Sequence, residues 1–218
     1  MADAQIDIFS DPVCPWCLVG LTRLNNAIAR FETPGAIGIS HHPFLLDANT
    51  PEQGEDVVEM LQRKYGRSPD EMWERLENEA KSSGLELDMR KQKWRNPSQK
   101  ALALIVAAHE KGTQHALALA LSHACYMEAK NIADTEVLQD IGAAHGFNAK
   151  EVAELVNSPE VIKAVEAKAR WAPEAGITGV PFFVFNNEFI LSGAQPEAVF
   201  DAALKKILSG QPRASQSN

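Results

Sequence analysis

The residues whose types and spacing most clearly indicate chemistry are Cys14-Pro15-Trp16-Cys17. Proline suits the first position of a helix, where its missing N–H costs nothing, and this places Cys14 on the N-cap. There the sulfur of Cys14 can accept hydrogen bonds from the unpaired backbone N–H groups of Trp16 and Cys17. Because the positive end of the helix dipole favours an anion at the same place, the pattern predicts a Cys14 thiolate that is a nucleophile near neutral pH.

The second cysteine of the motif supplies the partner for this nucleophile. Cys17 follows Cys14 by three residues, so the two side chains share a helix face and are close enough to form a disulfide. The pair indicates a reversible dithiol/disulfide centre in which Cys14 attacks and Cys17, one turn further in and more buried, resolves the mixed disulfide. Such a centre needs no metal or organic cofactor. A zinc site would need four ligands, and His123-Ala124-Cys125 is too tightly spaced to provide the second pair.

Four further side chains are of types that can take part in such chemistry. Asp11 either ties the turn before the helix or acts on the thiols as a proton acceptor and a local charge. Cys125 falls inside a predicted helix and is expected to be a buried, inert thiol. His41 and His42 are neighbours in a predicted strand, so one should face the core and the other solvent, and neither is expected to be catalytic.

Short strands at both ends of the chain must position these residues. A strand over 5–9 precedes the motif, a helix over 15–31 follows it, and a second strand over 38–44 comes after a turn at Thr33-Pro34-Gly35. This order is β–α–β, which predicts a parallel pair with a right-handed crossover. Strand character returns in the last part of the chain, with strands over 180–185 and 188–191 around an Asn186-Asn187 turn and a helix over 196–208.

Between these ends the apolar residues follow a helical period. Predicted helices cover 55–65, 70–83, 98–111, 114–130, 135–145, 149–156 and 159–172. Two of the predicted starts, Thr50-Pro51-Glu52-Gln53 and Ser68-Pro69-Asp70-Glu71, match a capping box with proline at the first position, and Asn96-Pro97 and Ser158-Pro159 resemble them. Trp73, Trp94 and Trp171 are expected to pack inside this helical block.

The order of elements predicts an α/β protein with a thioredoxin fold split by a large all-helical insertion. The thioredoxin-fold domain would comprise 1–49 and 175–210, the insertion 50–174, and a disordered tail 211–218. The predicted β–α–β and β–β–α units are the two halves of that fold.

Composition narrows the function classes. The 218 residues carry a formal charge of −8, which argues against a nucleic-acid-binding surface, and the basic run over 90–95 is predicted to be a solvated turn. Residues 1–5 lack the features of a secretory signal, and no apolar run is long enough to span a membrane. We therefore expect a cytoplasmic protein. Its three cysteines are too few for a structural disulfide framework.

Several segments resemble the DsbA-like thioredoxin-fold family, and specifically its cytosolic FrnE-type branch. The resemblance rests on the C-P-W-C motif with Asp11 and Gly20 around it, on Pro43-Phe44-Leu45-Leu46, and on Gly176-Ile177-Thr178-Gly179-Val180-Pro181-Phe182-Phe183. It extends over essentially the whole chain. Two departures are visible. The basic residue or histidine that the family often has shortly after Asn96, where it can contact an anionic co-substrate such as glutathione, has no clear counterpart near Lys100–Leu104, and no second cysteine pair lies near the C-terminus.

The resemblance implies a cis peptide bond between Val180 and Pro181, opposite the dithiol. Such a bond would present the backbone of Val180 toward Cys14, free to pair with an extended peptide or a glutathione-like backbone, with Trp16 covering the disulfide or meeting the substrate. The alternative is an ordinary proline at the start of a strand.

These observations favour a thiol:disulfide oxidoreductase that acts on thiol or disulfide substrates, either protein or glutathione-like. They do not fix the direction of electron flow or the oligomeric state. One alternative is a glutathione-dependent isomerase or kappa-type glutathione transferase on the same scaffold, although such relatives usually carry serine where this chain has Cys14. A second alternative is a non-catalytic helical binding module.

Overall fold

The computed structural model describes residues 4–31 and 37–209 of the chain. The predicted turn at 33–35 and the predicted tail over 211–218 lie outside these residues. None of the helices in the described ranges has the length and apolar character that crossing a bilayer requires.

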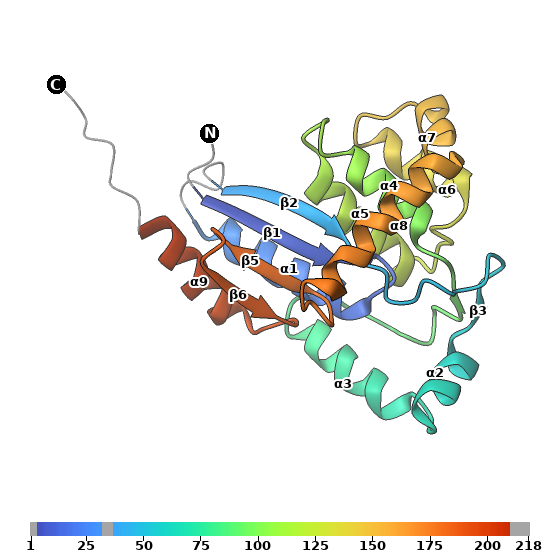
Figure 1. Cartoon of the computed structure of the whole chain (residues 1–218). Helices are drawn as coiled ribbons and strands as arrows, with labels where there is room; N and C mark the ends of the chain where they lie inside the picture. Colours follow the sequence, from blue (N-terminus) through green and yellow to red (C-terminus); the bar gives the residue numbers. More distant parts are fainter. Residues whose placement is uncertain (1–3, 32–36, 210–218) are drawn as a thin grey trace.

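A four-stranded sheet carries the site, with β1 (Ala4–Ser10) in its interior (Figure 1). The strand order is β2-β1-β5-β6, where β2 is Ile37–Pro43, β5 is Phe182–Phe185 and β6 is Phe189–Ser192. β1 runs parallel to β2, with Ile6 opposite Ile39, and antiparallel to β5, with Ile8 opposite Phe183. The predicted pairing of two chain ends more than a hundred residues apart is thus confirmed.

Two helices cover one face of this sheet. Helix α1 (Pro15–Ala29) follows β1, and α9 (Glu197–Ser209) packs beside it. Their buried side chains meet those of the strands in one apolar cluster, which includes Ile6, Ile8, Leu21, Leu24, Phe183, Phe185, Phe200 and Leu204. Because both cysteines precede or begin α1, this packing fixes them relative to the strands.

The chain between β2 and β5 is mostly helical. Its helices are α2 (Val57–Tyr65), α3 (Asp70–Lys81), α4 (Gln99–Ala107), α5 (Gln114–Tyr126), α6 (Thr135–Ala143), α7 (Ala149–Val156) and α8 (Pro159–Glu174). Helices α4 to α8 gather at the end of the sheet toward which β1 points, and α2 and α3 lie below them in Figure 1. The insertion also contains a short antiparallel pair, β3 (Glu55–Asp56) with β4 (Trp94–Arg95), that the helical periodicity did not predict.

The predicted helix start at Thr50-Pro51 is wrong. Helix α2 begins at Val57, and the Asp56 carboxylate caps it by accepting a hydrogen bond from the N–H of Glu59 at 2.9 Å. The proline segment instead forms a turn, closed by a bond from the Gly54 N–H to the Pro51 carbonyl. Gly54 is required there, since a Cβ would clash with the indole nitrogen of Trp94.

The other three predicted starts had mixed outcomes. Ser158 caps α8 as predicted, accepting from the N–H of Val161 with Pro159 in the first turn. Ser68 instead donates to the Asp70 carboxylate, so the predicted capping box of α3 does not form. Helix α4 starts at Gln99, without a side-chain cap hydrogen bond from Ser98.

Two of the three tryptophans expected inside the helical block are exposed. Trp73 is buried, but Trp94 is 45% and Trp171 57% exposed. Trp94 is not enclosed by the helices, and its indole N–H instead donates to the Gln53 carbonyl at 2.7 Å. Trp171 lies on the sheet side of α8, where its ring stacks on Phe9 at a centroid distance of 5.9 Å.

The two strand histidines divide as predicted, with His41 buried and His42 partly exposed beside Asp7. His41 joins a hydrogen-bonded chain in which its Nε2 lies 2.8 Å from Nδ1 of His115, whose Nε2 lies 2.9 Å from the side-chain Oδ1 of Asn25. Burial lowers the pKa of His41 well below its usual value and that of His115 to about 4. Both rings are therefore neutral in the folded protein at pH 7.

We expect this pair to make the fold acid-sensitive. Below pH 6.5 the unfolded chain takes up protons on these histidines while the folded chain does not, so stability is present above about pH 6.5 and is lost as the pH falls toward 4. For the partly buried His115 alone, the free energy of unfolding should drop by about 1–2 kcal/mol between pH 7 and pH 5. Urea denaturation at the two pH values measures the drop, and His115→Gln should reduce it. An unchanged drop in that variant would assign the sensitivity to other groups.

Candidate active site

The turn between β1 and α1 places Cys14 on the helix N-cap, as predicted. The N–H of Cys14 donates to the Asp11 carbonyl at 2.9 Å, and Pro15 occupies the first helical turn. The sulfur of Cys14 accepts a hydrogen bond from the N–H of Cys17 at 3.3 Å. A bond from the N–H of Trp16 was also expected, but the described contacts of this sulfur do not include one. An N-cap side chain reaches the third helical N–H, here that of Cys17, as readily as the second.

The two thiols are free and buried to different degrees. Cys14 keeps 3% of its surface exposed, whereas Cys17 is completely enclosed. Burial, followed by the hydrogen bond and charge of Cys14, raises the pKa of the Cys17 thiol well above its usual value. The reduced pair therefore consists of an N-cap sulfur that accepts a backbone hydrogen bond and a protonated thiol one turn behind it.

Asp11 ties the turn, as one of the two expectations from the sequence held, and its charge acts on a thiol. Its carboxylate accepts hydrogen bonds from the N–H groups of Val13 at 3.1 Å and Leu46 at 3.0 Å, so it ties the turn to the exit of β2. Burial raises the pKa of this carboxyl, and its hydrogen bonds oppose that rise. Its negative charge in turn contributes to the raised pKa of Cys17.

The loop before β5 supplies the third part of the site. The peptide bond between Val180 and Pro181 is cis, as the resemblance implied, and the thiol of Cys14 donates to the Val180 carbonyl at 3.7 Å. Gly20 on α1 lets the loop approach, because a Cβ on that residue would lie 2.8 Å from a ring carbon of Pro181.

Comparison with known proteins identifies the family. A model of the DSBA-like thioredoxin domain matches residues 5–205. The chain belongs to this family. Its enzymes are thiol-disulfide oxidoreductases or isomerases, so this DsbA-like chain is an enzyme of that class, and DsbA-like oxidoreductases act on thiol or disulfide substrates. A search of curated proteins gave no match.

Solved structures resemble the DsbA-like chain over nearly its whole length. A probable DsbA oxidoreductase from Streptomyces coelicolor is 29% identical, with a TM-score of 0.84 over 99% of this chain and 94% of that one. The cytosolic disulfide reductase DsbM from Pseudomonas aeruginosa, in a structure with GSH, is 21% identical, with a TM-score of 0.64 over 94% and 99%. A 2-hydroxychromene-2-carboxylate isomerase is 13% identical, with a TM-score of 0.68 over 94% and 97%. The last two show likeness of fold.

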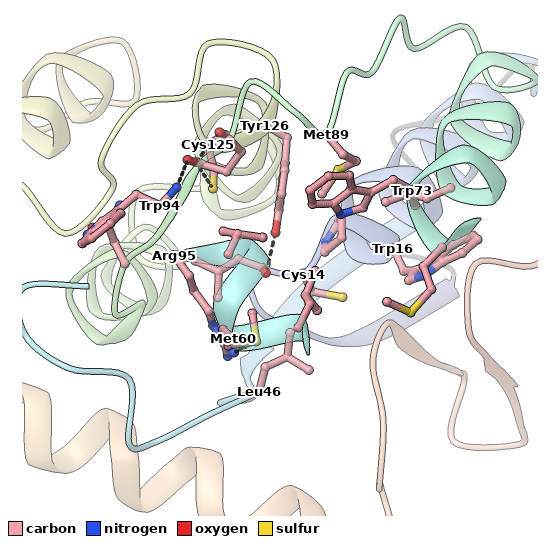
Figure 2. Close-up of a pocket in the computed structure, with 18 of the residues that line it drawn as sticks. Cys14, Trp16, Leu46, Met60, Trp73, Met89, Trp94, Arg95, Cys125 and Tyr126 are labelled. Carbon is pink, nitrogen blue, oxygen red and sulfur yellow. Dashed lines mark hydrogen bonds between the residues drawn. The ribbon is translucent and has the colours of Figure 1, made fainter. Parts of the chain in front are cut away.

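A cavity of about 280 Å³ opens beside Cys14 of the DsbA-like chain (Figure 2). Its walls come from the start of α1, from α2 and α3, from the segment over 89–96 and from the end of α5. Trp16 and Val180 both line it, so the structure brings all five residues predicted for the site, Cys14, Cys17, Trp16, Val180 and Pro181, to one end of α1. Trp16 is half-buried against the helical block rather than fully at the surface.

The cavity also contains residues that the sequence reading missed. Gln92 and Arg95 belong to the basic run predicted to be a solvated turn, yet Gln92 is buried and the Arg95 side chain is only 11% exposed. That prediction is correct for the exposed Arg90, Lys91 and Lys93 and wrong for these two. Arg95 directly precedes Asn96, so a cation lines the cavity on the N-terminal side of Asn96, whereas the resemblance sought a basic side chain after it, near 100–104.

The third cysteine also lines this cavity. Cys125 is buried, as predicted, and the Gln92 side-chain amide donates to its carbonyl at 2.7 Å and to its sulfur at 3.4 Å. Burial raises the pKa of the Cys125 thiol to about 12. It is therefore protonated at neutral pH and a poor nucleophile.

These surroundings predict the order in which the thiols react. With reduced protein and iodoacetamide at pH 7, we expect Cys14 to be modified first, because its sulfur accepts the N-cap hydrogen bond whereas burial raises the pKa values of Cys17 and Cys125. Peptide mapping by mass spectrometry after short reaction times locates the label. Faster labelling of Cys17 or Cys125 would contradict the arrangement.

Proposed function

We propose that the DsbA-like chain is a thiol:disulfide oxidoreductase of the FrnE type, with Cys14 as the nucleophile and Cys17 as the resolving thiol. The observation that carries the proposal is the position of the Cys14 sulfur, which accepts the Cys17 N–H at 3.3 Å and lies 3.7 Å from the Val180 carbonyl. One sulfur is thereby held by a helix N-terminus and directed at the loop where a substrate backbone can pair.

The reaction proceeds by two exchanges. The Cys14 thiolate attacks one sulfur of a substrate disulfide, forms a mixed disulfide and releases the other sulfur as a thiolate, which takes a proton from solvent. Cys17 then loses its proton and attacks the Cys14 sulfur, which forms the Cys14–Cys17 disulfide and releases the second substrate thiol. Two electrons and two protons pass to the substrate. Two equivalents of a low-molecular-weight thiol restore the dithiol, and the same steps run in reverse when the substrate is a dithiol.

The surrounding residues have distinct parts in this scheme. Asp11 is proposed as the acceptor of the Cys17 proton, since it is a buried carboxyl with a raised pKa whose charge already acts on that thiol. Val180 and Pro181 offer the backbone edge, and Trp16 forms part of the cavity wall. The helical unit over 50–174 supplies most of the remaining wall. The proposed chemistry uses the two thiols and no cofactor. We also propose a cytoplasmic location, where a pool of reduced thiols is present.

A redox titration tests the proposal. The purified protein is equilibrated with mixtures of reduced and oxidised glutathione, quenched in acid, alkylated and weighed. We expect the labels on Cys14 and Cys17 to disappear together as the mixture becomes more oxidising, while Cys125 stays labelled. A protein in which Cys14 and Cys17 never interconvert between dithiol and disulfide would contradict the proposed function.

A further inference from the structure

Cys14 meets substrates through the cavity rather than on an open surface. Only 3% of the residue is exposed, and the cavity of about 280 Å³ begins at its side chain. In Figure 2, Cys14 lies near the middle of the lining, with Trp16 and Trp73 on one side and Arg95 and Met60 on the other. A disulfide that reaches this sulfur must therefore place one of its substituents inside the cavity.

Most of the cavity wall is apolar. Besides aliphatic residues, its described lining includes three methionines and three tryptophans, namely Met60, Met72, Met89, Trp16, Trp73 and Trp94. Methionine side chains adapt to flat and irregular ligands, and aromatic rings stack on other rings. The volume lies near the lower end of the range for small-molecule pockets, about 300–1,000 Å³. These walls fit a compact, flat and apolar body better than the uniformly polar glutathione.

Two cations interrupt the apolar wall: Lys64 is exposed, whereas Arg95 is largely buried. Arg95 is 11% exposed and lines the cavity, and its Nη1 lies 3.6 Å from Asp47 and 3.7 Å from the sulfur of Met60. Its Nε is buried and has no hydrogen-bond partner among residues 4–31 and 37–209. Guanidinium groups bind carboxylates through two parallel N–H donors, so a largely buried Arg95 with a spare donor is suited to an anionic group.

We propose that the substrate is a small aromatic thiol, or its disulfide, that carries a carboxylate. The aromatic body occupies the cavity, the carboxylate pairs with Arg95, and the sulfur meets Cys14. This inference rests on the proposed function and names its substrate class. The disulfide of such a thiol is reduced by the two exchanges given above, with Cys14 and Cys17 oxidised in return. A polypeptide disulfide would need a wider approach to a sulfur that is almost enclosed.

Binding can be measured separately from redox chemistry in Cys14→Ser protein. Isothermal titration with naphthalene-2-carboxylate and with naphthalene-2-methanol compares two ligands that differ in the charged group. We expect the carboxylate to bind about tenfold more tightly, and Arg95→Gln to bring the two affinities to within about twofold. Leu61→Trp, which fills the cavity, should weaken both ligands by about tenfold. Failure of both ligands to bind, or a preference unchanged by Arg95→Gln, would overturn the proposal.

Matched controls lie on the same helix as Leu61. Val58 and Arg63 are exposed on α2 and are not part of the described cavity lining. Val58→Trp and Arg63→Gln should bind both ligands as the parent does. Thermal unfolding of every variant shows whether it is folded, and only folded variants are compared.

Single-turnover reduction with both thiols intact separates the two proposals. Reduced protein is mixed with bis(4-carboxyphenyl) disulfide, bis(4-hydroxymethylphenyl) disulfide or 2-hydroxyethyl disulfide, and thiol release is followed. Arg95→Gln should slow reduction of the carboxyphenyl disulfide by about tenfold and that of the hydroxymethylphenyl disulfide by less than about threefold. Each rate is divided by that of the parent protein with the same disulfide, so differences in leaving-group reactivity between the disulfides cancel. Reduction of all three without this pattern would overturn the substrate class and leave the proposed function standing. Reduction of none would overturn the proposed function, while the binding measurements would still decide whether the cavity takes the ligand.

Discussion

Cys14→Ser is expected to abolish disulfide turnover, with a loss of about a thousandfold or more, because no other described thiol can take its place. Cys17 is fully buried with a raised pKa, and Cys125 is protonated at neutral pH. Cys17→Ala should fail in a different way. Its Cys14 still attacks the substrate, but nothing resolves the product, so a mixed disulfide accumulates at Cys14.

Mass spectrometry under non-reducing conditions distinguishes these variants after exposure to oxidised glutathione. Cys17→Ala should gain one glutathione, mapped to Cys14, and Cys14→Ser should gain almost none. An adduct mainly on Cys17 in the Cys14→Ser protein would reverse the assignment of roles. Full turnover by Cys17→Ala would instead favour a glutathione-dependent isomerase or transferase, which has no need of a second thiol. If neither variant differs from the parent in any measured activity, the result would favour a non-catalytic binding module.

Gly20→Ala is expected to impair both stability and activity, although it adds a single methyl group outside the dithiol. The new Cβ would lie 2.8 Å from Pro181 and 3.3 Å from Phe183, so the loop that holds Val180 against Cys14 must move away from α1. Overpacking of this kind costs about 1–3 kcal/mol. We expect kcat/KM for disulfide reduction to fall by about tenfold, since misplacement of a positioning loop weakens substrate alignment.

Gly179→Ala provides the matched control for this substitution. Gly179 lies in the same loop, but a Cβ there would have no neighbour within 4 Å. Urea denaturation and single-turnover kinetics of the two variants should separate them clearly. Equal effects on both would show that the contact between Gly20 and Pro181 does not control the site.

The local features of the dithiol site could be predicted from contiguous residues. A strand, a turn and a proline at the first helical position are enough to place Cys14 on the N-cap, because capping depends on backbone groups within one helical turn. The three-residue spacing likewise puts Cys17 one turn behind. The β–α–β and β–β–α orders predicted the thioredoxin fold, since strand periodicity and chain connectivity restrict the ways in which such units can pair.

The cavity and its charge were decided only by tertiary packing. Sequence polarity placed Gln92 and Arg95 in solvent and Trp94 and Trp171 in the core, and all four predictions were wrong. The burial of a side chain depends on which distant segments cover it, here α2, α5 and β3, and no local pattern contains that information. The start of α2 also depended on a distant segment. Glu55 and Asp56 pair with β4 and are therefore extended, so the helix begins only at Val57. Local chemistry thus determined where the nucleophile lies, whereas long-range packing decided what surrounds it.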